Sequence, residues 1–195
     1  MSARLAAPAI VILAGGRATR FPGKLERTID GEPMLLRTYR NARATGWPVY
    51  LAGNGSIAVE LAARIDAPVL TDRWPGAGPL RAFLSACAMI ADERAFALAA
   101  DEPRVDRRLL EAVNAAWQAG DEAVVPEHDG RIEPLAALYL RAAVLREGAA
   151  TIERGNESMH GLIERTKARR VSVSPSYFVN VNTPEDLRHA ARMSH

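Results

Sequence analysis

Short apolar runs alternate along the first two thirds of the chain with segments whose apolar residues recur at helical spacing. The runs are typical of buried strands, and the spaced segments are typical of helices that pack against a sheet. We expect strands at 9–13, 49–52, 68–71, 95–100 and 123–126, and helices at 33–45, 57–65, 79–91 and 107–119. Strands that alternate with helices are joined by crossovers, so the pattern predicts an α/β fold with a mostly parallel sheet flanked by helices.

The pattern is less regular after residue 126. Residues 128–131 read HDGR and indicate a turn, whereas 135–140 suit either a strand or a helix. The prediction is completed by helices at 142–154 and 158–166, a strand at 171–173 and a last helix at 184–193. No repeat, low-complexity tract or linker divides the sequence, so residues 1–195 are expected to form a single domain.

Composition and charge exclude several classes of partner. The net charge is +2, from 25 basic and 23 acidic residues, which is too balanced to favour nucleic acid or an anionic membrane. The apolar runs are too short to span a bilayer. Cys87 is the only cysteine, so no internal disulfide can form, and a reducing, cytoplasmic location is expected. The four histidines show no ligand spacing and are expected at the surface: His128, His160, His189 and His195.

The first strand runs directly into a basic loop, and residues 13–24 read LAGGRATRFPGK. Gly15 and Gly16 allow a tight turn and a close approach of the backbone to a ligand. Backbone N–H groups in such a turn bind anions, and Arg20 and Lys24 add charged donors for phosphate oxygens. The loop therefore predicts a polyphosphate site; the alternative is a plain strand-to-loop turn with solvated basic residues.

Neither of the commonest phosphate-binding motifs fits this loop. A P-loop that ended in Gly23-Lys24 would need glycine where Ala18 stands and a hydroxyl where Leu25 stands. A dinucleotide fingerprint, G-x-G-x-x-G, does not occur. Carboxylates do follow two other expected strands, Asp72 after 68–71 and Asp101 after 95–100. Ligands of parallel α/β sheets bind beyond the carboxyl ends of the strands, so we expect the loop and both aspartates at one edge.

Five segments together resemble a known family. LAGGRATRFPGK at 13–24 resembles the signature loop of nucleotidyltransferases related to molybdenum cofactor guanylyltransferase. In family order follow GPL at 78–80, AADEP at 99–103, EPLAALY at 133–139 and FVNVNTPEDL at 178–187. The first loop and the D-x-P segment are shared by many sugar and isoprenoid nucleotidyltransferases, whereas the last two blocks are more specific. The resemblance covers nearly the whole chain.

The resemblance implies a Rossmann-like fold of the nucleotide-diphospho-sugar transferase type and an Mg²⁺-dependent enzyme. Its reaction would move GMP from GTP to the phosphate of molybdopterin, a pterin-phosphate acceptor, and release pyrophosphate. Residues 1–105 would form the nucleotide-binding half and residues 106–195 the acceptor-binding half. GTP is expected rather than CTP, because relatives that use cytidine nucleotides more often have alanine at the position of Gly15. Transient contacts with molybdoenzymes or cofactor-biosynthesis proteins are also implied.

The same resemblance assigns the catalytic residues. Asp101 is expected to bind the metal ion and the nucleotide, and its alternative is a turn or helix-capping aspartate. Lys24 is expected to contact the phosphates and stabilise charge on the α-phosphoryl group, with help from Arg20. No nucleophilic side chain is needed, because the acceptor phosphate attacks.

Further residues are expected to bind the two substrates. The loop contributes Leu13, Ala14, Gly15 and Gly16 to the nucleotide site.

Asp72 is expected to accept hydrogen bonds from guanine or ribose, and its alternative is a solvated strand-end carboxylate. Asn180 and Asn182, which share one face of an extended segment, are expected to bind the acceptor; alternatively they cap the turn before the last helix.

The sequence also departs from the family pattern. Arg81-Ala82 replaces the usual small pair after GPL, and Glu157 stands where a cation is expected. A carboxylate would repel an acceptor phosphate. We therefore expect Glu157 to point outward, with Arg154 or Arg165 serving the phosphate. Two other functions stay open: a nucleotidyltransferase for a cobamide precursor or sugar phosphate, and a non-catalytic nucleotide-binding subunit.

Overall fold

The computed structural model describes residues 6–14, 26, 28–53, 61, 63–74 and 76–178. Within them the main sheet has the strand order β10-β7-β9-β6-β1-β4-β5, and β8 pairs with β7. The strands of this order are β10 (Ala168–Ser172), β7 (Ala123–His128), β9 (Ala136–Leu140), β6 (Arg94–Ala99), β1 (Ala9–Leu13), β4 (Val49–Gly53) and β5 (Val69–Thr71), with β8 at Arg131–Ile132. Only the pairs formed by β9 and β8 are antiparallel, so the described sheet is mostly parallel, as predicted.

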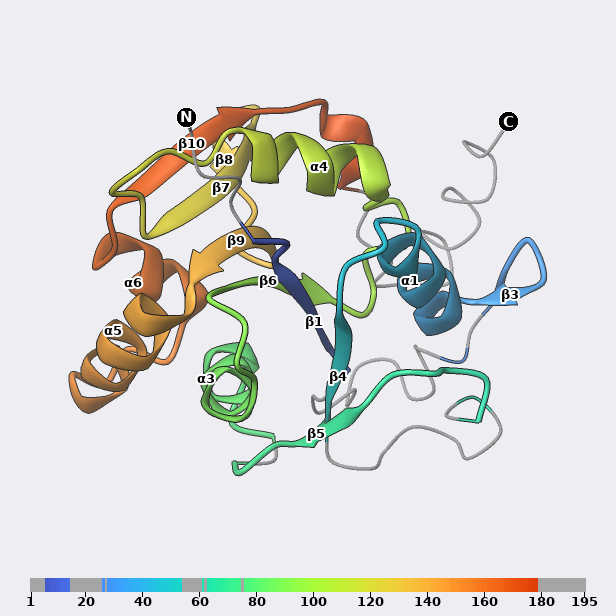
Figure 1. The fold of residues 1–195 in the computed structure, drawn as a ribbon, viewed down its shortest axis with the longest axis horizontal. Helices are drawn as coiled ribbons and strands as arrows, with labels where there is room; N and C mark the ends of the chain where they lie inside the picture. The colour runs from blue at the N-terminus through green and yellow to red at the C-terminus, as the bar shows by residue number, and fades with distance from the viewer. Residues whose placement is uncertain are drawn as a thin grey trace.

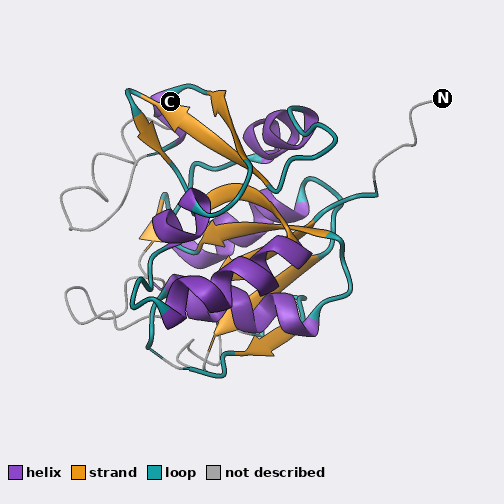
Figure 2. Ribbon diagram, turned by 90° about the vertical axis from the view of Figure 1, so that its left-hand side faces the viewer, coloured by secondary structure: helices purple, strands orange, loops and turns teal. Residues whose placement is uncertain are grey.

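β1 lies inside this sheet and is buried on both faces, which is why its sequence is a continuous apolar run. Val11 and Leu13 belong to the core cluster on one face, and Ile10 and Ile12 belong to the cluster on the other. The helices divide in the same way. α3 (Pro79–Met89), α5 (Arg141–Glu153) and α6 (Met159–Glu164) cover the first face, and α1 (Met34–Arg43) and α4 (Arg107–Ala115) cover the second (Figures 1 and 2).

The ambiguous segment at 135–140 is the strand β9, which is inserted antiparallel between β6 and β7. Tyr139 pairs with Ala95 on one side and with Ala123 on the other. α5 begins directly at Arg141. β7 is longer than predicted because it continues into a hairpin with β8, through Asp129 and Gly130, which both have positive φ.

Other differences from the sequence prediction lie at element ends. α1 begins at Met34 because Pro33 belongs to β3 (Glu32–Pro33), which forms a short hairpin with β2 (Thr28–Ile29) that was not predicted. A short 3₁₀ helix, Pro175–Tyr177, follows β10. The predicted helix at 57–65 falls largely outside the described residues, and the predicted helix at 184–193 falls wholly outside them.

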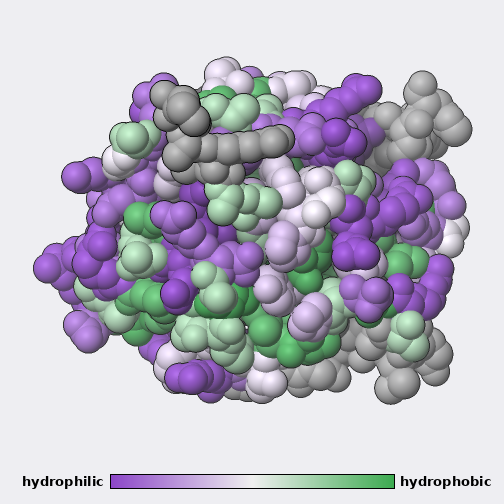
Figure 3. All heavy atoms as spheres, in the orientation of Figure 1, coloured by the Kyte–Doolittle hydropathy of each residue, from purple (hydrophilic) through white to green (hydrophobic). Residues whose placement is uncertain are grey.

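The face of the molecule seen in Figure 3 is mixed, with apolar atoms gathered in its lower half around α3 and β5. Two exposed large apolar side chains, Val69 and Met89, belong to these elements. Among the described residues, no helix combines the length and the apolar character that crossing a membrane requires.

Candidate active site

The parallel strands β6, β1, β4 and β5 are neighbours, so their carboxyl ends share one edge of the sheet. Leu13 pairs with Ala99, and its carbonyl accepts from the N–H of Ala100 at 3.4 Å. Ala14 is buried and donates its N–H to Ala52 O at 2.9 Å. The start of the glycine-rich loop therefore lies beside the turn that carries Asp101.

That turn is fastened to α1 by side-chain hydrogen bonds. Thr38, fully buried, donates to the carbonyl of Ala100 at 3.1 Å. Asn41 donates to the carbonyls of Pro103 at 3.1 Å and Val105 at 3.3 Å. These bonds fix the backbone on both sides of Asp101, so its position is set by the scaffold rather than by the loop alone.

Asp72 follows β5 and is 5% exposed. Its Oδ1 accepts from the N–H of Trp74 at 2.9 Å, and the N–H of Arg73 donates to Ser85 Oγ at 3.2 Å. The first contact is the local turn bond of an aspartate two residues ahead of its donor. The contact of Asp72 with guanine or ribose stays a prediction.

A cavity of about 450 Å³ opens where the carboxyl end of β6 meets residues from the second half of the chain. Its walls come from the turn after β6, the start of α3, the β8–β9 connection and the start of α6. The lining residues are Pro79, Ala99, Asp101, Glu102, Ile132, Glu133, Pro134, Leu135, Glu157, Ser158, Met159 and His160. The described lining contains four carboxylates and no lysine or arginine.

The wall at 132–135 is held from behind by β9 and β7. Tyr139 is fully buried, and its hydroxyl donates to the carbonyl of Pro134 at 2.8 Å. His128 Nε2 lies 2.8 Å from Glu133 Oε1, and the His128 ring stacks on Phe178 with centroids 4.9 Å apart. The side chain of His128 is only 10% exposed, so the expectation of a surface histidine was wrong here. It is wrong because the β7–β8 hairpin folds His128 back onto Glu133.

The wall at 157–160 begins α6. Ser158 caps this helix by accepting from the N–H of Gly161 at 3.0 Å. Glu157 does not point away from the site. It lines the cavity, and Arg81 Nη2 lies 2.7 Å from its Oε1. The hydrogen bond from Arg81 lowers the pKa of Glu157, so it is ionised at neutral pH.

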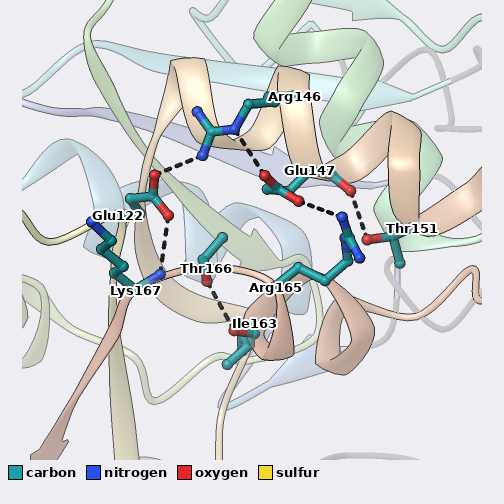
Figure 4. A network of polar contacts seen from close by, with 8 residues as sticks. All are labelled: Glu122, Arg146, Glu147, Thr151, Ile163, Arg165, Thr166 and Lys167. Atoms are coloured by element: carbon teal, nitrogen blue, oxygen red, sulfur yellow. Dashed lines mark hydrogen bonds and ion pairs between the residues drawn. The ribbon is translucent and has the colours of Figure 1, made fainter.

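The two arginines expected to serve the acceptor phosphate are absent from the cavity lining. Arg165 pairs with Glu147 at 2.8 Å, and Arg154 is exposed at the end of α5. Figure 4 shows that Arg165 belongs to a network that joins α5 to the end of α6 and to Lys167, the residue before β10. In the same network Arg146 contacts both Glu122, at 2.6 Å, and Glu147, at 2.8 Å. Arg165 is thus engaged in an ion-pair network, and, contrary to the expectation, neither Arg154 nor Arg165 lines the cavity.

The residue types that line the cavity suit a divalent metal ion that takes part of its ligands from a substrate. Within the described part of the chain, no three His, Cys, Asp or Glu side chains are placed to hold a metal by themselves. Asp101, Glu102 and Glu133 are nevertheless among the lining residues, and a carboxylate is a hard oxygen ligand. Mg²⁺ usually takes one or two carboxylates and completes its shell with phosphate oxygens and water.

Leu13, Ala14, Asp72 and Asp101 are thus gathered at one sheet edge, as the strand pattern predicted. The other predicted site residues lie outside the described residues, and their roles stay predictions: Gly15, Gly16, Arg20, Lys24, Asn180 and Asn182. Sequence reasoning gave no site role to Glu133 and His160, which line the cavity, or to His128, which contacts Glu133. The Asp-Gly turn after His128 signals the hairpin that brings His128 to Glu133.

Comparison with known proteins identifies what this architecture resembles. Residues 10–190 match the model of the MobA-like NTP transferase domain. A molybdenum cofactor guanylyltransferase from Cereibacter sphaeroides is 32% identical over 187 residues, covering 92% of this chain and 93% of the relative. A probable molybdenum cofactor guanylyltransferase from Mycobacterium avium is 32% identical over 192 residues, covering 93% and 94%.

Solved structures show the same fold. Molybdopterin-guanine dinucleotide biosynthesis protein A from Archaeoglobus fulgidus superimposes with a TM-score of 0.78 at 24% identity, covering 95% of this chain and 97% of that one. 4-Diphosphocytidyl-2C-methyl-D-erythritol synthase from Anaerococcus prevotii gives a TM-score of 0.75 at 11% identity, covering 96% and 97%. The nucleotide-diphospho-sugar transferase fold predicted from the sequence is confirmed.

Proposed function

The chain belongs to the MobA-like NTP transferase family and is a nucleotidyltransferase, and from that membership we propose that it moves GMP from GTP to the phosphate of molybdopterin. The observation that carries the proposal is the position of Asp101. It stands at the carboxyl end of β6, beside the start of the loop after β1, and it lines a cavity built from both halves of the chain. A nucleotide on the loop and an acceptor in the cavity would meet at this carboxylate.

The reaction is a substitution at the α-phosphorus of GTP. An oxygen of the acceptor phosphate forms the new bond, the bond to the β-phosphate oxygen breaks, and pyrophosphate leaves with the electron pair. Positioning and charge neutralisation supply the catalysis in such a transfer. Lys24 and Arg20 would neutralise the phosphates, and the loop backbone at Gly15 and Gly16 would hold them. Asp72 would serve the base or ribose, and Asn180 and Asn182 would hold the acceptor.

Mg²⁺ is the proposed cofactor, and Asp101 is its proposed protein ligand. When bound, the ion neutralises charge on the phosphate oxygens. The chain's own contribution is a fixed carboxylate, because Thr38 and Asn41 tie down the backbone around it. Asp101→Asn preserves shape and removes the charge, so it should leave the fold intact and abolish metal-dependent transfer.

A second acceptor class, a cobamide precursor or a sugar phosphate, is supported by one observation. Glu157 lines the cavity where the family pattern leads one to expect a cation, and its carboxylate would repel a phosphate placed beside it. A different acceptor would place its phosphate elsewhere.

Pyrophosphate release tests both proposals. The purified protein is assayed with GTP and Mg²⁺, alone and with molybdopterin, cobinamide phosphate or a sugar 1-phosphate. We expect release that depends on molybdopterin, and Asp101→Asn should melt like the wild type yet release none. Release driven by another acceptor would replace the proposed substrate. Nucleotide binding without release would indicate a binding subunit, and a folded Asp101→Asn protein with normal turnover would refute the metal assignment.

A further inference from the structure

The walls of the cavity present a problem of charge, given the function proposed above. A phosphate monoester is an anion, whereas the described lining of the cavity contributes the carboxylates of Asp101, Glu102, Glu133 and Glu157. A metal ion at Asp101 would offset part of this charge on one side. The wall at 157–160, which carries Glu157, would need a cation of its own.

Among the described residues, Arg81 is a cation that contacts this wall through Glu157, although Arg81 does not itself line the cavity. It lies in the first turn of α3, two residues after Pro79, which itself lines the cavity. Its guanidinium sits over the Trp74 ring, 5.6 Å from the centroid, and donates to Glu157 at 2.7 Å. The first turn of α3 has no acidic residue, and the N-terminal end of a helix favours an anion.

We propose that Arg81 receives the phosphate of the acceptor and that Glu157 occupies this guanidinium until the acceptor displaces it. Arg81 therefore determines acceptor specificity, and Glu157 is its internal competitor. This inference rests on the proposed function, because it identifies the cation that the acceptor's phosphate meets.

The burial of the two side chains suits such an exchange. The Arg81 side chain is 21% exposed and rests on Trp74, so its planar donor group keeps its orientation when its partner changes. The Glu157 side chain is 46% exposed, so its carboxylate can turn into water at little desolvation cost. A phosphate dianion can take both nitrogens of the guanidinium with charge-assisted hydrogen bonds.

Separate variants of the two residues distinguish an exchange from a purely structural ion pair. Glu157→Gln removes the competing charge and keeps the shape, so it should bind the acceptor severalfold more tightly. Arg81→Met removes the receptor and should weaken acceptor binding about tenfold, the loss expected for a charge-assisted hydrogen bond. If the ion pair only holds the wall in place, both variants would loosen the wall and weaken acceptor binding.

Binding is measured by calorimetry on the full-length protein without GTP, with molybdopterin as the first probe and inorganic phosphate as the second. The KM for GTP is measured in parallel and should not change. The surface pair Arg107 and Glu111, 2.8 Å apart on α4, provides matched controls, because neither residue lines the cavity. Arg107→Met and Glu111→Gln should bind both probes like the wild type.

The exchange is supported if, with either probe, Glu157→Gln binds more tightly than the wild type and Arg81→Met binds more weakly. If phosphate follows this order while molybdopterin does not bind, the proposed acceptor is wrong and the exchange stands. If molybdopterin is a substrate but the order is absent with both probes, the exchange is overturned and the proposed function survives. Equal weakening by both variants also overturns it, since that result marks a structural pair.

Discussion

Removing one hydroxyl from the wall behind the cavity should change both stability and acceptor binding. Tyr139 is fully buried on β9, donates to Pro134 O at 2.8 Å and packs against Phe83 with ring centroids 5.3 Å apart. Burial raises the pKa of its hydroxyl, so it remains a donor at every physiological pH. Tyr139→Phe keeps the ring and removes the donor that the structure gives to Pro134.

The size of the effect follows from burial. A buried carbonyl that loses its partner costs about 1–3 kcal/mol. For a domain of this length, each 1 kcal/mol lowers Tm by about 2–4 °C, so a loss of about 2 kcal/mol gives about 4–8 °C. Pro134 lines the cavity, so the same loss should loosen the wall at 132–135 and raise the KM for the acceptor.

Thermal melts and steady-state kinetics with each substrate varied in turn measure the two effects. Tyr39→Phe is the matched control, because Tyr39 on α1 is 8% exposed, donates to the carbonyl of Asp66 at 2.8 Å and does not line the cavity. The control should lower Tm without changing either KM. An unchanged Tm and an unchanged acceptor KM in Tyr139→Phe would refute the reasoning.

Three further predictions concern the nucleotide, the acceptor and acid stability. GTP should be used faster than CTP at subsaturating concentration, because Gly15 leaves room for the larger base; equal rates would contradict this. Asn182→Ala should raise the KM for the acceptor with little change for GTP, and the reverse pattern would move Asn182 to the nucleotide site. The pKa of Glu147 is lowered by hydrogen bonds from Arg146 and Arg165, and that of Glu122 by the N–H of Lys167 and then by Arg146. The ionised carboxylates therefore stabilise the folded protein fully above their ordinary pKa of 4.5, and this stabilisation is lost as pH falls through their lower folded pKa values. Glu147→Gln should lower Tm at neutral pH, and its Tm should fall less steeply in acid than that of the wild type.

The central strands could be predicted because the information is local. Every position of β1 is apolar and buried, and β1 pairs along its length with β6, whose end carries Asp101. The sequence of β9 did not distinguish a strand from a helix. It forms a strand because it pairs with β6 and β7, and this long-range pairing cannot be read from the local sequence.

The candidate site was predicted only in part, and for the same reason. Asp101 was selected because a carboxylate directly follows an apolar run, and the structure places it in the cavity lining. Arg81 and Glu157 were each recognised as departures from the family pattern, yet they stand 76 residues apart, and nothing local in the sequence shows that they form a pair. The outward orientation expected for Glu157 was wrong because it left out a partner from α3.

Following the α-phosphate of GTP tests the central claim most directly. GTP labelled at the α-phosphorus is incubated with the protein, Mg²⁺ and molybdopterin, and the products are separated and weighed by mass spectrometry. We predict that the label enters a pterin-guanine dinucleotide, with one unlabelled pyrophosphate for each GMP transferred. Label that stays in GTP, or appears as free GMP or in the product of another acceptor while molybdopterin is unchanged, would contradict the account.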